Sequence, residues 1–173
     1  MRIEKNGEVL LNKPFSEEAA QPPESRRSLT VEDIIAFADK VDLDDVRAPI
    51  ARQIEYNTAI AEAGLTGQYG AAIGKILLDS YGDSVQNRAK AWAAAGSDAR
   101  MNGCEKPVVI NSGSGNQGIT VSVPVIEYAR ELGASDETLC RALALSNLIA
   151  IHEKAGIGRL SAYCGAVSAG CAA

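Results

Sequence analysis

Residues 111–118 (Asn-Ser-Gly-Ser-Gly-Asn-Gln-Gly), here called the glycine segment, restrict the fold of this chain more than any other stretch. Three glycines among polar side chains favour a backbone that turns tightly and comes close to another group. Glycine also leaves its N–H accessible, so successive amides can converge on an anion, most readily where a helix begins. We expect the segment to bind the carboxylate of a small substrate. The alternative is an ordinary glycine-rich surface turn between two core elements.

The glycine segment does not match the patterns of nucleotide-binding sites, because it is neither G-x-G-x-x-G nor G-x-x-x-x-G-K-[ST]. The formal net charge is -5, and no basic stripe is present to neutralise the phosphates of a nucleic acid. No apolar run reaches the roughly 18–20 residues of a membrane span. The first residues lack the apolar core of a signal peptide. We therefore expect a cytoplasmic protein with neither nucleic-acid nor membrane partners.

The chain carries four cysteines, Cys104, Cys140, Cys164 and Cys171, without a C-x-x-C pair. This spacing argues against a structural zinc site, and a chain of this length without an export signal is not a typical disulfide scaffold. Cysteines in such surroundings are most often small buried hydrophobic residues. The alternative is that at least one of them ligates a metal or an iron–sulfur cluster.

The N-terminal region is organised differently from the rest of the chain. Residues 1–13 predict a β-hairpin, because Asn6 and Gly7 form the strongest short hairpin signal between two strand-like runs. A lone hairpin is marginal in water, and the rest of the chain offers no sheet for it to join. We expect it to be the remnant of an α/β portion that lies upstream. Residues 14–28 contain prolines and no apolar periodicity, which predicts a linker.

Residues 29–173 predict an all-α, bundle-like domain of six or seven helices, because apolar residues recur at helical spacing and strands do not alternate with helices. Predicted N-caps are Thr30, Ser84 and Ser135, and predicted helix ends lie near Gly64 and at Gly96, Gly133 and the pair Gly156 and Gly158. Pro49 and Pro124 suit the first turns of two helices. The small-residue run at 160–173 suits a closely packed helix that stops in mid-pattern, which suggests an internal fragment.

Residues 97–103 form a short polar and charged stretch between two apolar segments, which predicts a loop. The loop could be an ordinary connection. Alternatively, it places Asp98 and Arg100 beside the glycine segment, as orienting groups or as a clamp for a carboxylate. The single histidine, His152, excludes a catalytic triad or a histidine-rich metal site from this chain alone. His152 and Lys154 are weak candidates for a general base, which stays unassigned.

Three segments, taken in order, closely resemble the bacterial and archaeal L-cysteine desulfidase family, a relative of the α chain of iron–sulfur L-serine dehydratases. They are residues 97–101 (Ser-Asp-Ala-Arg-Met), 111–120 (the glycine segment followed by Ile-Thr) and 158–164 (Gly-Arg-Leu-Ser-Ala-Tyr-Cys). The resemblance extends from about residue 30 to the last residue. It implies an oxygen-sensitive [4Fe-4S] enzyme that cleaves L-cysteine to pyruvate, ammonia and sulfide without pyridoxal phosphate. One iron of the cluster would act on the substrate as a Lewis acid.

The resemblance also suggests site residues. Substrate-binding candidates are Ser112, Gly113, Ser114, Gly115, Asn116, Gln117, Gly118, Asp98, Arg100 and Arg159. Cys164 alone falls on a cluster position of the family, and the family's Gly-Cys-Thr-Glu-Pro and Cys-Asp-Gly-Ala elements do not occur here. Because one thiolate cannot hold four irons, we expect this chain to lack the cluster and to be inactive alone.

Two alternatives to the desulfidase interpretation stay open. The first is an L-serine dehydratase-type lyase, since the sequence does not discriminate between cysteine and serine as the amino-acid substrate. The second is a non-catalytic helical module that binds a small anion or another chain. Its surfaces rich in alanine and glycine would serve a homo-oligomer as well as a core.

Overall fold

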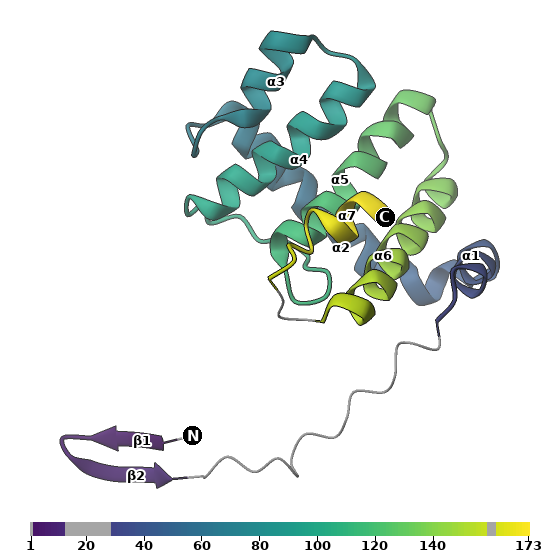
Figure 1. Ribbon diagram of the computed structural model, residues 1–173. Coiled ribbons are helices and arrows are strands. Elements are labelled where there is room, and N and C mark those ends of the chain that lie inside the picture. Colours follow the sequence, from purple (N-terminus) through teal and green to yellow (C-terminus); the bar gives the residue numbers. More distant parts are fainter. Residues whose placement is uncertain (1, 13–28, 159–161) are drawn as a thin grey trace.

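The computed structural model describes residues 2–12, 29–158 and 162–173. The predicted linker at 14–28 lies outside these ranges. The described parts contain a two-stranded hairpin and a domain of α-helices, as the sequence predicts (Figure 1). The helices are α1 (Val31–Lys40), α2 (Leu43–Thr66), α3 (Ile73–Tyr81), α4 (Val85–Met101), α5 (Gly115–Leu132), α6 (Asp136–Ile157) and α7 (Ser168–Ala172).

The hairpin joins β1 (Arg2–Lys5) to β2 (Glu8–Asn12) in antiparallel register, with Ile3 opposite Leu11. Its turn residues, Asn6 and Gly7, have φ values of 52° and 83°. Two successive left-handed residues are the geometry that this dipeptide favours between twisted strands. The predicted hairpin is therefore confirmed, whereas its origin in an upstream sheet stays a prediction.

The predicted helix starts at Thr30, Ser84 and Ser135 are confirmed by their capping hydrogen bonds. Each hydroxyl oxygen accepts from the backbone N–H three residues later, at 3.1, 3.4 and 3.2 Å respectively. These bonds satisfy N–H groups that have no acceptor within the helix. Gly133, with φ 60°, ends α5 as predicted.

Three predicted helix boundaries are wrong. α2 starts after Asp42, whose carboxylate accepts from the N–H of Asp44, so Pro49 lies inside the helix. α4 passes through Gly96, where a Cβ would lie 3.1 Å from Ile119, so this glycine permits close packing and does not end the helix. α5 begins at Gly115 with Pro124 in its interior, because burial of the flanking apolar residues outweighs the cost of about 3 kcal/mol for an interior proline.

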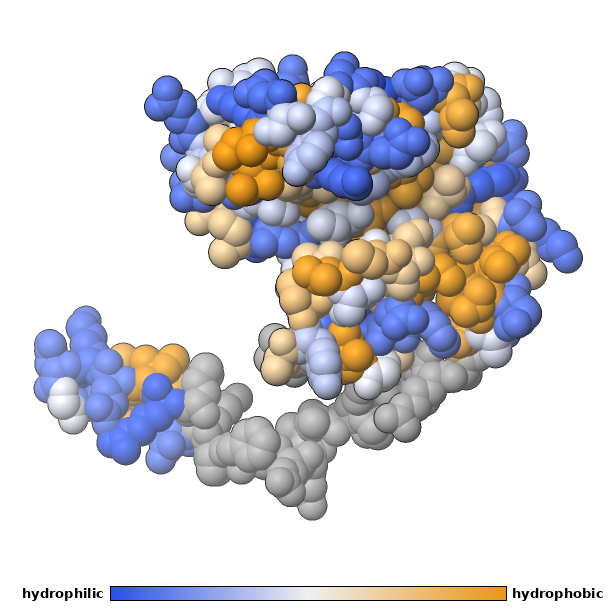
Figure 2. All heavy atoms as spheres, turned by 45° about the horizontal axis from the view of Figure 1, so that its top comes forward, coloured by the Kyte–Doolittle hydropathy of each residue, from blue (hydrophilic) through white to orange (hydrophobic). Residues whose placement is uncertain are grey.

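The surface of the helical domain mixes polar side chains with apolar areas, as the visible face shows (Figure 2). Within the described ranges, no helix combines the length and the apolar character needed to cross a membrane.

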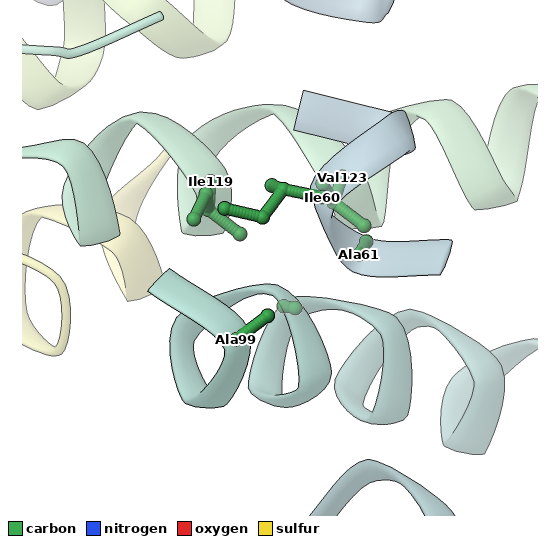
Figure 3. Close-up of a cluster of buried hydrophobic side chains, with 6 residues drawn as sticks. Ile60, Ala61, Ala99, Ile119 and Val123 are labelled. Carbon is green, nitrogen blue, oxygen red and sulfur yellow. The ribbon is translucent and has the colours of Figure 1, made fainter. Parts of the chain in front are cut away.

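The core of the domain forms where α2, α4 and α5 meet. Its buried members, most of which Figure 3 labels, are Ile60, Ala61, Ala93, Ala99, Ile119 and Val123. A second cluster joins α2, α5 and α6 around Ile126 and Leu143, and a third joins α5, α6 and α7 around Val121 and Ala169. α5 takes part in all three clusters and is therefore the central helix.

Gly64 allows α2 to approach α4 closely, because a Cβ at this position would collide with the backbone carbonyl of Ala95. We expect Gly64→Ala to lower the free energy of unfolding by about 1–3 kcal/mol through overpacking. The matched control is Gly156→Ala in α6, where nothing lies within 4 Å of an added Cβ. That change should stabilise the domain by roughly 0.5–1 kcal/mol through helix propensity. Urea denaturation measures both, and equal effects would contradict the packing argument.

Candidate functional site

The glycine segment forms a tight turn that leads directly into α5. Asn111 and Ser114 exchange two backbone hydrogen bonds, of 3.1 and 3.0 Å, and between them Ser112 and Gly113 adopt φ values of 48° and 85°. Ser114 caps α5 because its hydroxyl accepts from the N–H of Gln117 at 3.2 Å. The predicted tight turn is confirmed, and it lies where N–H groups of a first helical turn point outward without acceptors in the helix.

Arg100 lies against this first turn, as predicted. A Cβ at Gly115 would collide with the Arg100 guanidinium and lie 3.0 Å from its Cδ, so glycine is what permits the contact. Nη1 of Arg100 donates to Oδ1 of Asn116 at 3.1 Å. The structure therefore brings Arg100 to the positive end of the α5 dipole.

Asp98 faces a different neighbour. The predicted loop at 97–103 is wrong, because residues up to Met101 belong to α4. Side chains two positions apart on an α-helix point about 200° apart, so Asp98 and Arg100 lie on opposite faces of α4. Oδ2 of Asp98 accepts from the N–H of Ile73 at 2.9 Å, which caps α3 in place of Ala72, whose own side chain makes no such bond. The observed contact of Asp98 is thus with α3.

Asn57 of α2 fastens the glycine segment to the core. Its side chain is 0% exposed, and its Nδ2 donates to the carbonyl of Gly118 and to Oγ of Ser122, each at 3.0 Å, and to the carbonyl of Val109 at 3.2 Å. Its Oδ1 accepts from the N–H of Val109 at 2.8 Å. Gly118 completes this contact, because a Cβ there would collide with the carbonyl of Val109.

A chain of side-chain amides anchors the other side of the segment. Nδ2 of Asn111 donates to Oδ1 of Asn147 in α6 at 2.9 Å, and Nε2 of Gln117 donates to Oδ1 of Asn111 at 2.8 Å. Asn147 also exchanges hydrogen bonds with Gln53 of α2, at 3.0 and 2.7 Å. Oε1 of Gln117 is buried without a hydrogen-bond partner among the residues that the structure describes.

Sequence reasoning missed three of these residues: Gln53, Asn57 and Asn147. The signal that could have found them is their spacing. Gln53 and Asn57 lie four residues apart, so both share a helix face, and the same face carries the buried Ile50 and Ile60. A polar amide within an apolar stripe needs a buried partner.

Cys164 lies next to the contact between the C-terminal segment and α5. A Cβ at Gly165 would collide with Oε1 of Gln117, and a Cβ at Gly170 would lie 2.6 Å from Oγ1 of Thr120. Gln117 and Thr120 are three residues apart and share one face of α5. The thiol of Cys164 is exposed. Arg159, a predicted site residue, lies outside the described residues.

Cys140 and Cys104 lie away from the C-terminal segment that carries Cys164 and Cys171. Cys140 is buried in the α2–α5–α6 cluster. Cys104 is half-buried beside Tyr69, and its thiol, as a hydrogen-bond partner and a nearby charge, raises the pKa of the Tyr69 hydroxyl. Within the described ranges, no three or more Cys, His, Asp or Glu side chains gather as a metal site would require. The described residues therefore do not by themselves fit a [4Fe-4S] cluster.

An apolar groove of about 460 Å³ runs between α5, α6 and α7. Tyr128, Leu132, Leu139 and Cys171 contribute to its lining, and Leu132 is 77% exposed. The groove extends along α5 from Thr120 to Leu132, and its lining includes no residue of the glycine segment. It is thus a surface separate from the turn at residues 111–118.

The hydrogen bonds of Asn57 give a testable stability prediction. We expect Asn57→Leu to lower the free energy of unfolding by about 3 kcal/mol, because leucine leaves the half-buried N–H and carbonyl of Val109 without their Asn57 partner and removes the bonds to Gly118 and Ser122. Gln86→Leu is the control, since Gln86 is exposed on α4, and surface changes are usually within about 0.5 kcal/mol. Urea denaturation of both variants measures the difference, and similar losses would refute the assigned role of Asn57.

Comparison with known proteins places this architecture in a family. Residues 7–173 match the family model described as serine dehydratase alpha chain. A UPF0597 protein of Desulfitobacterium hafniense is 57% identical over 171 residues, which are 99% of this chain and 40% of that protein. A UPF0597 protein of Lachnoclostridium phytofermentans is 58% identical over 97% of this chain and 40% of its own length. No solved structure matches the chain.

The chain thus spans about two-fifths of the length of the curated relatives that it matches. The match covers the glycine segment, α4 and the segment that carries Cys164. It confirms the relationship to the iron–sulfur serine dehydratase alpha chain that the three sequence motifs indicate. The chain belongs to the serine dehydratase alpha chain family, a family of lyases associated with iron–sulfur clusters.

Proposed function

We propose that this chain supplies the carboxylate-binding part of a lyase that eliminates the β-substituent of a small amino acid. The observation that carries the proposal is the position of Arg100 against the first turn of α5. There the glycine segment aims backbone N–H groups outward, and a carboxylate is small enough to bind two of them at once.

The charges at this position support an anionic ligand. The N-terminus of an α-helix carries a partial positive charge, so a cation beside it is unfavourable unless an anion joins them. The hydrogen bonds of Arg100 go to Asn116 and to the sulfur of Met101, and within the described ranges it has no carboxylate partner. A substrate carboxylate would complete this arrangement with charge-assisted hydrogen bonds.

We further propose L-cysteine as the substrate, with pyruvate, ammonia and sulfide as products, on the strength of the desulfidase resemblance. Loss of the Cα proton and cleavage of the Cβ–S bond would give aminoacrylate, which hydrolyses to pyruvate and ammonia. L-serine is the second candidate substrate, favoured by the family description. In this proposal Arg159 also shapes the pocket, and Asp98 acts through its cap on α3.

For the complete enzyme we propose Cys164 as one ligand of a [4Fe-4S] cluster, with the other ligands outside the described residues. The exposure of Cys164 and the contact of the adjacent Gly165 with Gln117 of α5 support this assignment. Because the desulfidase resemblance assigns only Cys164 of this chain to the cluster, we expect the chain to be inactive alone. A second candidate function is a non-catalytic module that packs against another chain, such as a second copy, and the apolar groove between α5, α6 and α7 favours it.

The test is a chimera in which this chain replaces the matching 171 residues of the Desulfitobacterium hafniense relative. After anaerobic reconstitution with iron and sulfide, we expect sulfide and pyruvate from L-cysteine, and none from this chain alone. Arg100→Met should lower kcat/KM about tenfold or more, because a hydrogen bond to a charged group contributes about 1.5–3 kcal/mol. Arg47→Met, at an exposed position on α2, is the matched control and should leave kcat/KM unchanged.

The cluster ligand is tested in the same chimera. Cys164→Ala should remove the visible iron–sulfur absorbance, whereas Cys104→Ala should retain it because Cys104 lies beside Tyr69. Ammonia from L-serine without sulfide from L-cysteine would assign the enzyme as a dehydratase. Failure of the chimera and of the intact relative to convert either amino acid would contradict the proposed lyase function.

A further inference from the structure

The amide of Gln117 is held in one orientation with its oxygen unpaired. The side chain is 0% exposed, and Nε2 is committed to Oδ1 of Asn111 at 2.8 Å. Asn111 is in turn fixed by Asn147. Oε1 therefore points away from this chain of amides and toward Gly165, with no donor from the described residues. A buried acceptor without a donor is costly, and such a group in a native fold calls for a ligand or another explanation.

A cationic side chain lies beside the same position, on the side of Gly165 that faces Gln117. Lys154 of α6 is 8% exposed, and its Cδ lies 3.2 Å from the position that a Cβ of Gly165 would take. Lys154 makes no ion pair with any described acidic residue. Lys154 thus carries a charge at a mostly buried position without a described ion-pair partner, so an anion that reaches its ammonium group would gain a charge-assisted hydrogen bond.

Gly165 lies against both side chains, the acceptor without a described donor and the cation without a described ion pair. Its lack of a side chain is what allows the backbone to cover Oε1 of Gln117, since any Cβ would collide there. A donor group from a ligand would reach Oε1 only if this backbone shifts away from α5. The exposed acceptor and the cation of Lys154 would then line one space beside the first turn of α5.

We propose that Gln117 and Lys154 together recognise the zwitterion of an α-amino acid. Oε1 of Gln117 accepts a hydrogen bond from the α-ammonium group. Lys154 contributes its charge to the α-carboxylate that the first-turn amides of α5 bind. The choice of ligand rests on the proposed function. The choice of Gln117 for the ammonium group and of Lys154 for the carboxylate rests on the acceptor without a described donor and the cation without a described ion pair.

The proposal is tested by calorimetric binding to the 173-residue chain itself. The ligands are L-alanine, which keeps both charged groups, propionate, which lacks the ammonium, and ethylamine, which lacks the carboxylate. We expect L-alanine to bind more tightly than either analogue. Gln117→Leu should weaken L-alanine binding about tenfold, the effect of losing one hydrogen bond to a charged group, and should leave propionate binding unchanged. Lys154→Met should weaken both L-alanine and propionate.

Two exposed positions provide matched controls, Gln68→Leu and Lys90→Met, which should bind all three ligands as the original chain does. Propionate binding by Gln117→Leu also reports whether the glycine segment is still folded, since that ligand uses only the amides and Lys154. The proposal fails if L-alanine does not bind, or if Gln117→Leu retains full affinity for it. It also fails if Lys154→Met binds as before and only loses stability, because Lys154 would then serve Gln117 as an internal donor.

These outcomes are distinct from those of the lyase test. If the chain binds L-alanine selectively but the chimera shows no turnover, the proposed reaction is refuted and the proposed recognition by Gln117 and Lys154 is still supported. Turnover by a chimera whose KM for L-cysteine is unaffected by Gln117→Leu would refute the recognition alone.

Discussion

Hydrogen bonds from buried side-chain amides hold the glycine segment in place, and the candidate site depends on them. Asn57 binds the backbone on both sides of the turn, while Asn111, Asn147 and Gln117 join the turn to α6. In a poorly solvated interior such bonds are strong and their loss is costly, so a satisfied network selects one backbone conformation. The left-handed residues at the tip of the turn are retained because both of its ends are fixed.

Small residues make this arrangement compact. Aromatic side chains are 5% of the sequence, and the interface of α4 with its neighbours is built largely from alanines. Such residues bury little area each, so the helices must approach closely to fill the core. Gly64 and Gly118 permit two of these approaches. The glycine segment therefore serves two purposes, since Gly118 packs the core while the residues before it form the turn.

The sequence predicted the features that are encoded locally. Thr30, Ser84 and Ser135 act through their own neighbouring N–H groups, so a short window of sequence is sufficient to identify them. Gly96 and Pro124 were misjudged because their roles depend on distant partners: Gly96 faces Ile119, and burial on both sides keeps Pro124 inside α5. Arg100 was placed correctly beside the turn, although from a predicted loop. The partnership of Asn57 with Val109 spans too much sequence for local reasoning to find.

One turn of α4 serves two neighbours at once, since Asp98 caps α3 while Arg100 lies on α5. Each residue of an α-helix is rotated by about 100° from the one before it. Deleting or inserting a single residue earlier in α4 would therefore rotate both side chains, Asp98 away from α3 and Arg100 away from α5. We therefore expect homologous chains to tolerate changes in the length of the loops around α4 and to keep the number of residues between its packed alanines and Arg100.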